Sequence, residues 1–331
     1  MRIKELDVFR GFAALAVVLY HYTTMYNKMC NVSSSWELPY GWLGVPVFFI
    51  LSGFVIYLTV DKSKSAIDFL KKRFIRLYPT YWLCLLITLC IEYFSGMFLA
   101  DLTWKDILMN FTMFQQFFNL RHVDGAYWSL LPELLFYGLM AFLMKIKKVR
   151  SYYLYNAILL IIGIIHLVFP LPIIGKILSI HYILLFMIGI AFYRIYNKMN
   201  TKWDYVFIIF NYIVGTKLYF NAQEHHSISN VFSYFSLALI ICLYYLFVKG
   251  CFSFLAKFRV LIFFGNISYA LYLIHQNIGY IIINNLEDFT GRNMAMFIAL
   301  GISVILASLI TFQVEPRIKP IVKKLLYNNN N

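Results

Sequence analysis

The sequence of 331 residues has few charged side chains and few cysteines. Charged residues make up 13% of it, against about 25% in an ordinary soluble domain, and hydrophobic residues make up 61%. The five cysteines contain no CxxC pair, so their spacing indicates neither a disulfide framework nor a zinc site. This composition excludes a water-soluble globular protein and leaves a membrane protein.

A basic folded domain and a cleavable signal peptide are also missing from the pattern. The net charge of +14 is spread over short connecting segments, so nucleic-acid binding is not expected. The first apolar run contains Arg10 and is too long for a signal-peptide core. We therefore expect this run to remain in the mature protein as its first membrane span.

Apolar runs of about 20 residues, the length that crosses a bilayer, recur along the whole chain. We predict ten spans, at residues 8–26, 41–60, 78–98, 129–144, 152–169, 177–196, 203–220, 230–248, 263–285 and 293–315. With the N-terminus inside, 22 of the 29 Lys and Arg residues face the cytoplasm and six face out, which fits the positive-inside rule. The prediction is an all-α, polytopic membrane protein of about ten transmembrane helices with both termini cytoplasmic. Residues 1–331 then form a single integral-membrane domain with no appended soluble domain.

Two ionisable side chains lie on one face of the first span. Arg10 and His21 are eleven residues apart, which is three helical turns plus roughly 20°. A charged residue inside a membrane costs roughly 2.5–3.5 kcal/mol on insertion scales. A chain that keeps two such residues on one stripe is expected to use them.

Counting residues along the spans places four ionisable side chains in one layer of the outer half of the membrane. They are His21, Glu92, Glu133 and His275, and Arg10 lies below them, towards the cytoplasm. A histidine or acid in a span also serves simply to link two helices by hydrogen bonds. That structural alternative stays open for each of the four.

Two connecting segments carry additional signals. The inner segment 61–77 has apolar residues at helical spacing, which predicts a helix on the membrane surface. Its Arg73 and Arg76 share a face and suit either a lipid anchor or a phosphate clamp, since guanidinium groups grip phosphate with two parallel bonds. The outer segment 97–128 leads into Trp128 and Ser129, and Ser129 is a suitable N-cap for the fourth span.

Six motifs follow one another along the chain. They are LDVFRGFAALAVVLYHY (6–22), GVPVFFILSGFVI (44–56), RFIRLYPTYW (73–82), YWSLLPELLFY (127–137), ISYALYLIHQ (267–276) and VEPRIK (314–319). In this order they resemble the bacterial membrane-bound acyltransferase family 3, which includes O-acetyltransferases of surface polysaccharides and lipid-linked glycans. Residues 145–260 match the family only in hydropathy. Some members carry an extra esterase-like domain, which we do not expect in this chain.

The resemblance implies a reaction and roles for the residues. An acyl group, acetyl in most members, moves from cytoplasmic acyl-CoA to a hydroxyl of an extracytoplasmic surface glycan or lipid-linked sugar, without a metal. A neutral histidine is the usual general base for such a hydroxyl. The implied catalytic residues are His21 as base and Glu133 as its partner; the donor-binding residues are Arg10, Arg73 and Arg76; and the acceptor-binding residues are Trp128, Ser129 and His275. Whether His21 acts only as a base or carries the acyl group stays open.

The resemblance also implies a location and partners. We expect a multi-pass protein of the bacterial inner (plasma) membrane that contacts acyl-CoA, the glycan acceptor and lipids. A second copy of the chain or glycan-assembly proteins are the expected protein partners. A transporter or flippase for a glycan intermediate is the main alternative, because intramembrane charges and the broken second span are transporter features; a non-catalytic assembly subunit is another. The arginine pair at 73 and 76 together with His21 favours the enzyme, since transport needs neither.

Overall fold

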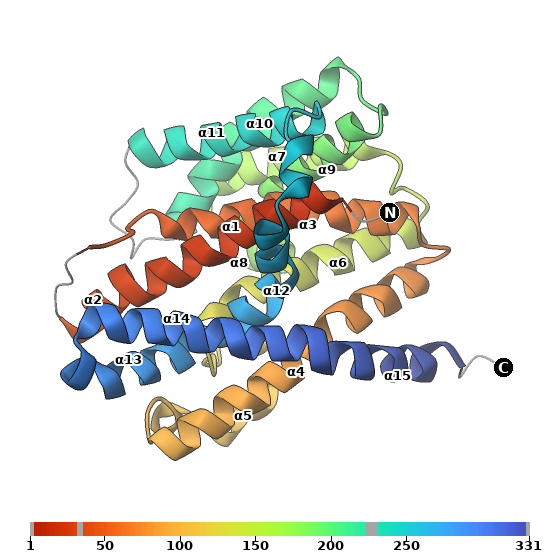
Figure 1. Ribbon diagram of the computed structural model, residues 1–331. Helices are drawn as coiled ribbons and strands as arrows, with labels where there is room; N and C mark the ends of the chain where they lie inside the picture. The colour runs from red at the N-terminus through yellow and green to blue at the C-terminus, as the bar shows by residue number, and fades with distance from the viewer. Residues whose placement is uncertain (1–2, 32–35, 223–230, 329–331) are drawn as a thin grey trace. The chain divides into compact units, whose positions relative to one another are not determined.

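The computed structural model describes residues 3–31, 36–222 and 231–328. Every regular element in these ranges is a helix (Figure 1), which confirms the predicted all-α class. Part of the predicted loop 27–40 and the first residue of the predicted span 230–248 lie outside the described residues.

Six helical segments among the described residues are long and apolar enough to cross a membrane. They are Gly41–Asp61, Ala66–Ser95, Gly125–Lys145, Pro172–Tyr196, Val231–Val248 and Arg292–Tyr327. The helices Tyr152–Val168 and Arg259–Ile274 are apolar but shorter. A polytopic membrane protein is therefore confirmed, while the number of ten spans and the side on which the termini lie stay predictions.

The chain forms two compact units, and each is described by itself. Unit 1 consists of Met1–Gly44, Arg73–Leu131 and Phe258–Asn331, and unit 2 consists of Val45–Lys72 and Pro132–Lys257. Unit 1 is thus built from three separate stretches of sequence, two of which lie near opposite ends of the chain.

The helices of unit 1 come from its three stretches of sequence. The first stretch forms α1 (Lys4–Tyr20), a π-helical segment η1 (His21–Met25), α2 (Tyr26–Cys30) and η2 (Gly41–Leu43). The others form most of α4 (Ala66–Ser95), η3 (Leu99–Asp101), α5 (Trp104–Asn110), η4 (Gln115–Phe118), η5 (Gly125–Ser129), α12 (Arg259–Ile274), α13 (Gln276–Thr290), α14 (Arg292–Leu309), η7 (Ile310–Val314) and α15 (Glu315–Asn328). The elements α14, η7 and α15 continue one another as a long rod, with α13 beside α14 (Figure 1).

The backbones of α1 and α12 touch at two glycines. A Cβ on Gly265 would lie 1.9 Å from the carbonyl oxygen of Asp7, and one on Gly11 would lie 2.9 Å from the amide nitrogen of Gly265. Small residues allow membrane helices to approach this closely. His21 follows Gly11 by ten residues and His275 follows Gly265 by ten residues. Since both pairs are in contact, the two helices run side by side in the same direction.

The inner segment with Arg73 and Arg76 differs from its expected form. It is not a separate surface helix but the beginning of α4, which runs for 30 residues through Pro79. The Thr80 hydroxyl donates to Glu315 Oε1 of α15 at 2.7 Å, and the Tyr81 hydroxyl donates to a carbonyl at the end of α5 at 2.6 Å. These tertiary bonds hold the helix directly after the proline, and the proline leaves only one helical hydrogen bond unmade.

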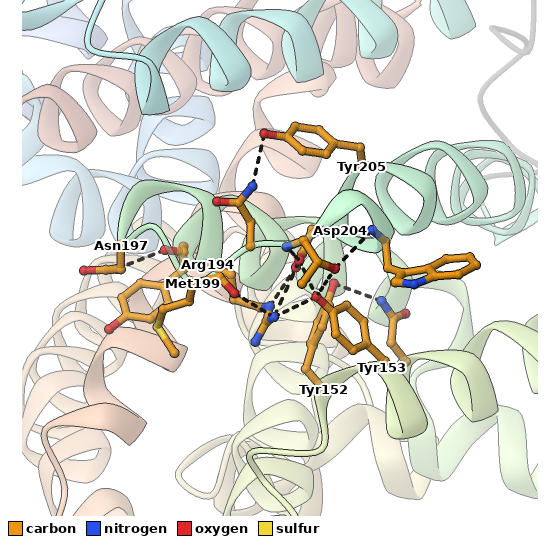
Figure 2. Close-up of polar contacts among 12 residues, drawn as sticks. Tyr152, Tyr153, Arg194, Asn197, Met199, Asp204 and Tyr205 are labelled. Atoms are coloured by element: carbon orange, nitrogen blue, oxygen red, sulfur yellow. Dashed lines mark hydrogen bonds and ion pairs between the residues drawn. The ribbon is translucent and has the colours of Figure 1, made fainter.

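Unit 2 is held by a buried ion pair. Its helices are α3 (Gly44–Asp61), the first turns of α4, α6 (Leu130–Lys145), α7 (Tyr152–Val168), α8 (Pro172–Leu178), α9 (Ile180–Tyr196), α10 (Lys202–Ala222), α11 (Val231–Val248) and η6 (Ser253–Lys257). Figure 2 shows Arg194 of α9 between Asp204 and Tyr153, with Nε 2.7 Å from Asp204 Oδ1 and Nη2 donating to the Tyr153 hydroxyl at 2.8 Å. The Tyr153 hydroxyl in turn donates to Asp204 Oδ2 at 2.6 Å. The cluster therefore ties α7, α9 and α10 together.

Candidate active site

Two histidines of unit 1 lie in direct contact. His21 is the first residue of the π-helical segment that follows α1, and such segments are frequent at functional sites. His275 joins α12 to α13 and is fully buried. His275 Nε2 lies 3.0 Å from His21 Nδ1. The structure therefore brings together two of the four residues that the sequence placed in one layer.

Each imidazole is also fixed to a backbone carbonyl of its own helix. His275 Nδ1 lies 2.7 Å from the carbonyl oxygen of Tyr272, and His21 Nδ1 lies 3.0 Å from that of Val17. Because a carbonyl oxygen only accepts hydrogen bonds, both Nδ1 atoms carry the proton in these contacts. The rings are thus oriented by the helices from which they project.

Tyr22, the neighbour of His21, binds the backbone at His275, where α12 meets α13. Its hydroxyl donates to the carbonyl oxygen of His275 at 2.9 Å and lies 2.8 Å from Ser303 Oγ on α14. A Cβ on Gly279 would lie 2.3 Å from this hydroxyl, so the glycine leaves the space that the tyrosine ring occupies. The backbone around His275 is therefore held by η1, α13 and α14 together.

A buried acidic link lies two residues beyond His275. The Asn277 side-chain amide donates to Glu92 Oε1 at 2.7 Å, and its backbone amide donates to Asp124 Oδ2 at 3.0 Å. Ala126 donates its backbone amide to Asp124 Oδ1 at 2.8 Å. Burial raises the pKa of the Asp124 carboxyl from 3.8 to about 7. Glu92 is thus linked through Asn277 to the segment that follows His275.

Of the other predicted site residues in this region, the two acceptor-binding residues belong to unit 1 and the catalytic acid belongs to unit 2. Ser129, in unit 1, directly precedes α6, and its hydroxyl lies 2.8 Å from the Tyr272 hydroxyl of α12. Trp128 beside it is half-buried. Glu133 belongs to unit 2, where its Oε1 accepts a hydrogen bond from Tyr137. Its pairing with His21 stays a prediction.

The predicted donor-binding arginines all belong to unit 1. Arg10 of α1 pairs with Asp7, with Nη1 3.4 Å from Oδ1, and the acid offsets part of its charge. Arg73 is buried, whereas Arg76, one turn further along α4, is exposed. The exposed guanidinium is thus available at the surface of the helix that leads into the predicted third span.

A basic cavity of about 450 Å³ lies between α4 and the start of α15. It is lined by Ile75, Thr311, Glu315, Pro316, Lys319, Pro320 and Lys323. Glu315 accepts hydrogen bonds from both Thr80 and Lys319, so it neutralises one lysine, and the positive charge of Arg76 acts on the same lysine. The cavity therefore carries a net positive charge and lies close to Arg73 and Arg76. The sequence did not reveal this cavity.

The other described histidines form local bonds. His122 Nδ1 lies 2.9 Å from the Gln115 side-chain amide, and burial lowers the pKa of His122 to about 4. In unit 2, His166 accepts from a backbone amide, and His181 Nδ1 lies 3.0 Å from the carbonyl oxygen of Leu218. Within residues 3–31, 36–222 and 231–328, no three His, Cys, Asp or Glu side chains are grouped to bind a metal ion.

Comparison with known proteins decides the family. Residues 3–312, nearly the whole chain, match the family model of acyltransferase 3, described as an acyltransferase domain. The chain belongs to acyltransferase family 3. No solved structure matches it.

Two curated relatives of this acyltransferase-family chain are similar over part of their length. ORF330 of Acidianus two-tailed virus, provisionally named an acetyltransferase, is 26% identical over 153 residues, which cover 46% of this chain and 43% of the relative. Nodulation protein 10 of Rhizobium leguminosarum bv. viciae is 26% identical over 165 residues, which cover 44% of this chain and 45% of the relative. The matched regions thus span less than half the length of either relative.

The motifs of this family-3 chain are divided between its two units. Unit 1 holds the R-x10-H, RxxR and ISYALYLIHQ motifs and the first half of the W-S-x-x-x-E element, whereas Glu133 and most of the second-span motif belong to unit 2. Unit 1 therefore combines a pair of imidazoles with a basic cavity. These are the parts that proton transfer and phosphate binding require.

Proposed function

We propose that the protein is a membrane O-acyltransferase. It moves an acyl group, acetyl in the first instance, from cytoplasmic acyl-CoA to a hydroxyl of an extracytoplasmic surface glycan or lipid-linked sugar. The observation that carries this proposal is the contact of 3.0 Å between the imidazoles of His21 and His275 in a family-3 chain. Together with the basic cavity beside α4, this pair favours an acyltransferase over a transporter.

The donor is proposed to bind at the beginning of α4. Coenzyme A carries several phosphate charges, and an arginine fork grips phosphate with two parallel bonds. Arg73 and Arg76 supply such forks, and the cavity of about 450 Å³ beside Ile75 adds Lys319 and Lys323. Its volume falls within the range of small-molecule sites. The residues present therefore fit a polyphosphate ligand.

His21 is proposed to act as the general base. The acceptor hydroxyl oxygen forms a bond to the thioester carbonyl carbon while His21 takes the hydroxyl proton, a role in which a neutral histidine contributes about 10²–10⁴-fold. The carbon–sulphur bond then breaks, and the departing thiolate takes the proton back from His21, giving an ester and free coenzyme A. Glu133 is proposed to stabilise the transient imidazolium, and Arg10 to hold the donor nearer the inner surface.

The acceptor is proposed to enter from the outer side, next to Trp128 and Ser129. The name of the viral relative supports acetyl as the transferred group. The family and the apolar helices support a bacterial inner-membrane location. A glycan-assembly protein or a second copy of the chain is the proposed protein partner.

Hydrolysis of acetyl-CoA tests the proposal without knowledge of the acceptor, because water replaces the hydroxyl. The purified full chain in detergent is incubated with acetyl-CoA, and released coenzyme A is measured by chromatography. His21→Ala should lower the release by about 10²–10⁴-fold at unchanged abundance. His181→Ala, a matched change at a histidine of unit 2 that contacts a backbone carbonyl, should retain it. Release by the wild type no faster than in protein-free detergent would refute the proposed function.

A further inference from the structure

The hydrogen-bond geometry of the two imidazoles fixes their protonation. His275 Nδ1 faces the carbonyl oxygen of Tyr272 at 2.7 Å, and His21 Nδ1 faces that of Val17 at 3.0 Å. Carbonyl oxygens have no proton to give, so each Nδ1 is a donor. A neutral His275 then presents the lone pair of Nε2 to His21 Nδ1, 3.0 Å away. The proton on His21 Nδ1 is then shared between two acceptors, as in a three-centre hydrogen bond.

The alternative protonation conflicts with the surroundings. If His275 Nε2 donated to His21 Nδ1, the latter would turn a lone pair towards the carbonyl oxygen of Val17 at 3.0 Å. His275 would also need two protons and a positive charge, because its Nδ1 already donates to Tyr272. Its side chain is fully buried, where an unpaired charge is very costly. The neutral arrangement satisfies all three contacts.

We infer that His275 is a positioning residue that fixes the tautomer of His21, rather than a binding residue for the acceptor. With the proton held on Nδ1, the lone pair of His21 lies on Nε2, which becomes the basic atom. The inference rests on the proposed function, in which His21 accepts a proton. In hydrolases with a catalytic triad, a carboxylate holds the corresponding position at Nδ1; here an imidazole holds it.

The pair also provides for the charge that forms during the reaction. When His21 Nε2 takes the hydroxyl proton, the Nδ1 proton belongs to a cation, and its bonds to His275 Nε2 and Val17 become charge-assisted and stronger. His275 keeps its own proton on Nδ1, bonded to Tyr272. No proton leaves the pair until His21 returns it from Nε2 to the departing thiolate.

The fold holds the pair rigidly enough for this role. The contact of α1 and α12 at Gly11 and Gly265 sets the height of both histidines, which follow those glycines by ten residues each, about 15 Å along each helix. Tyr22 donates to the carbonyl oxygen of His275 at 2.9 Å and fixes the junction at that height. The imidazole contact is therefore determined by backbone packing.

Nitrogen-15 NMR of the full chain, labelled at histidine and kept in detergent at pH 8, reads the tautomer directly. The signals of His21 are identified by their loss in His21→Gln. We expect a protonated Nδ1 and an unprotonated Nε2 at His21 in the wild type. In His275→Leu, which removes the acceptor at similar volume, a measurable fraction of the tautomer protonated at Nε2 should appear. A wild-type His21 protonated mainly at Nε2 would overturn the inference.

Kinetics of acetyl-CoA hydrolysis provide the second readout. His275→Leu should lower kcat by about 10–100-fold, the loss that follows removal of the partner that orients a metal-binding histidine, with the KM for acetyl-CoA within about twofold. His275→Gln restores an acceptor oxygen for His21 Nδ1 and should recover at least a tenth of the wild-type kcat. His181→Leu is the matched control in unit 2 and should leave kcat unchanged.

The outcomes separate the inference from the proposed function. An inactive wild type would refute the proposed function. An active wild type with an unchanged kcat in His275→Leu, or with equal losses in His275→Leu and His275→Gln at normal abundance, would refute the positioning role alone. The NMR measurement in the wild type does not depend on activity, and it needs only His21→Gln, for the assignment.

Discussion

Replacing Asp124 by asparagine tests how the buried acidic link responds to pH. The Asp124 carboxyl is fully buried and accepts backbone hydrogen bonds from Ala126 and Asn277. Burial raises its pKa from 3.8 to about 7. Because one pKa unit corresponds to about 1.4 kcal/mol, the ionised carboxylate is about 4 kcal/mol costlier in the folded protein than in the unfolded chain.

The sign of the pH dependence follows from the direction of this change. The folded state binds the Asp124 proton more tightly than the unfolded chain does. The resulting stabilisation is fully present below pH 3.8 and is lost as the pH rises through about 7. Asparagine is neutral throughout and lacks this dependence, although it replaces one of the two acceptor oxygens with a donor, at a pH-independent cost of about 1–3 kcal/mol.

The free energy of unfolding, measured by SDS titration in mixed micelles, is the appropriate quantity. Between pH 4.5 and pH 8, Asp124→Asn should gain about 3–4 kcal/mol relative to the wild type. Asp106→Asn is the control from the same outer segment. The Thr103 hydroxyl holds the pKa of Asp106 below 3.8, so that group stabilises the protein above pH 3.8 and loses its effect only in more acid solution.

The control variant should therefore differ from the wild type by a constant amount across the measured range. Parallel curves for Asp124→Asn and the wild type would refute the reasoning, because they would mean that Asp124 is ionised throughout or is reached by water.

Three further predictions concern the donor, the acid partner and the topology. Arg76→Lys keeps the charge but should weaken coenzyme A binding by about 1.5–3 kcal/mol, measured by calorimetry in detergent at fixed salt; an unchanged affinity would favour a lipid anchor, which depends on net charge. Glu133→Gln keeps an acceptor for Tyr137 but removes the negative charge, and should lower kcat for acetyl-CoA hydrolysis while the donor KM is retained; a change in KM alone would place Glu133 with the donor instead. Single cysteines at Ser65 and at Ser34, which lies outside the described residues, should label from opposite sides of the membrane in a Cys-free background, and equal labelling of intact cells by an impermeant reagent would contradict the topology.

Depth along the spans was enough to predict part of the site. The helical period and the rise per residue placed four side chains at one height, those of His21, Glu92, Glu133 and His275. The structure joins His21 to His275 directly and reaches Glu92 through Asn277. Glu133 belongs to the other unit, and its place beside His21 stays a prediction. Depth is predictable because the rise per residue of a helix is fixed and the length of a span is known. The hydrogen-bond partner of each imidazole nitrogen is not predictable from the sequence, because it depends on the rotation and register of neighbouring helices.

Other parts of the site gave no usable signal. Asp124 stands before a glycine in a polar segment, and an Asp-Gly pair normally indicates a turn, so its full burial was not foreseen. Residues 61–77 were predicted to form a surface helix ahead of a third span at 78–98. In the structure α4 continues through Pro79, and Thr80 and Tyr81 form tertiary bonds directly after it.

The joining of α1 to α12 also sets an order in time. His21 and His275 are 254 residues apart in the chain, and a ribosome adding about 5–20 residues per second needs about 13–50 s to make that stretch. During this interval the first histidine is present without the partner that orients it. A nascent chain therefore acquires its complete imidazole pair only late in its synthesis, after all of unit 2 has been made.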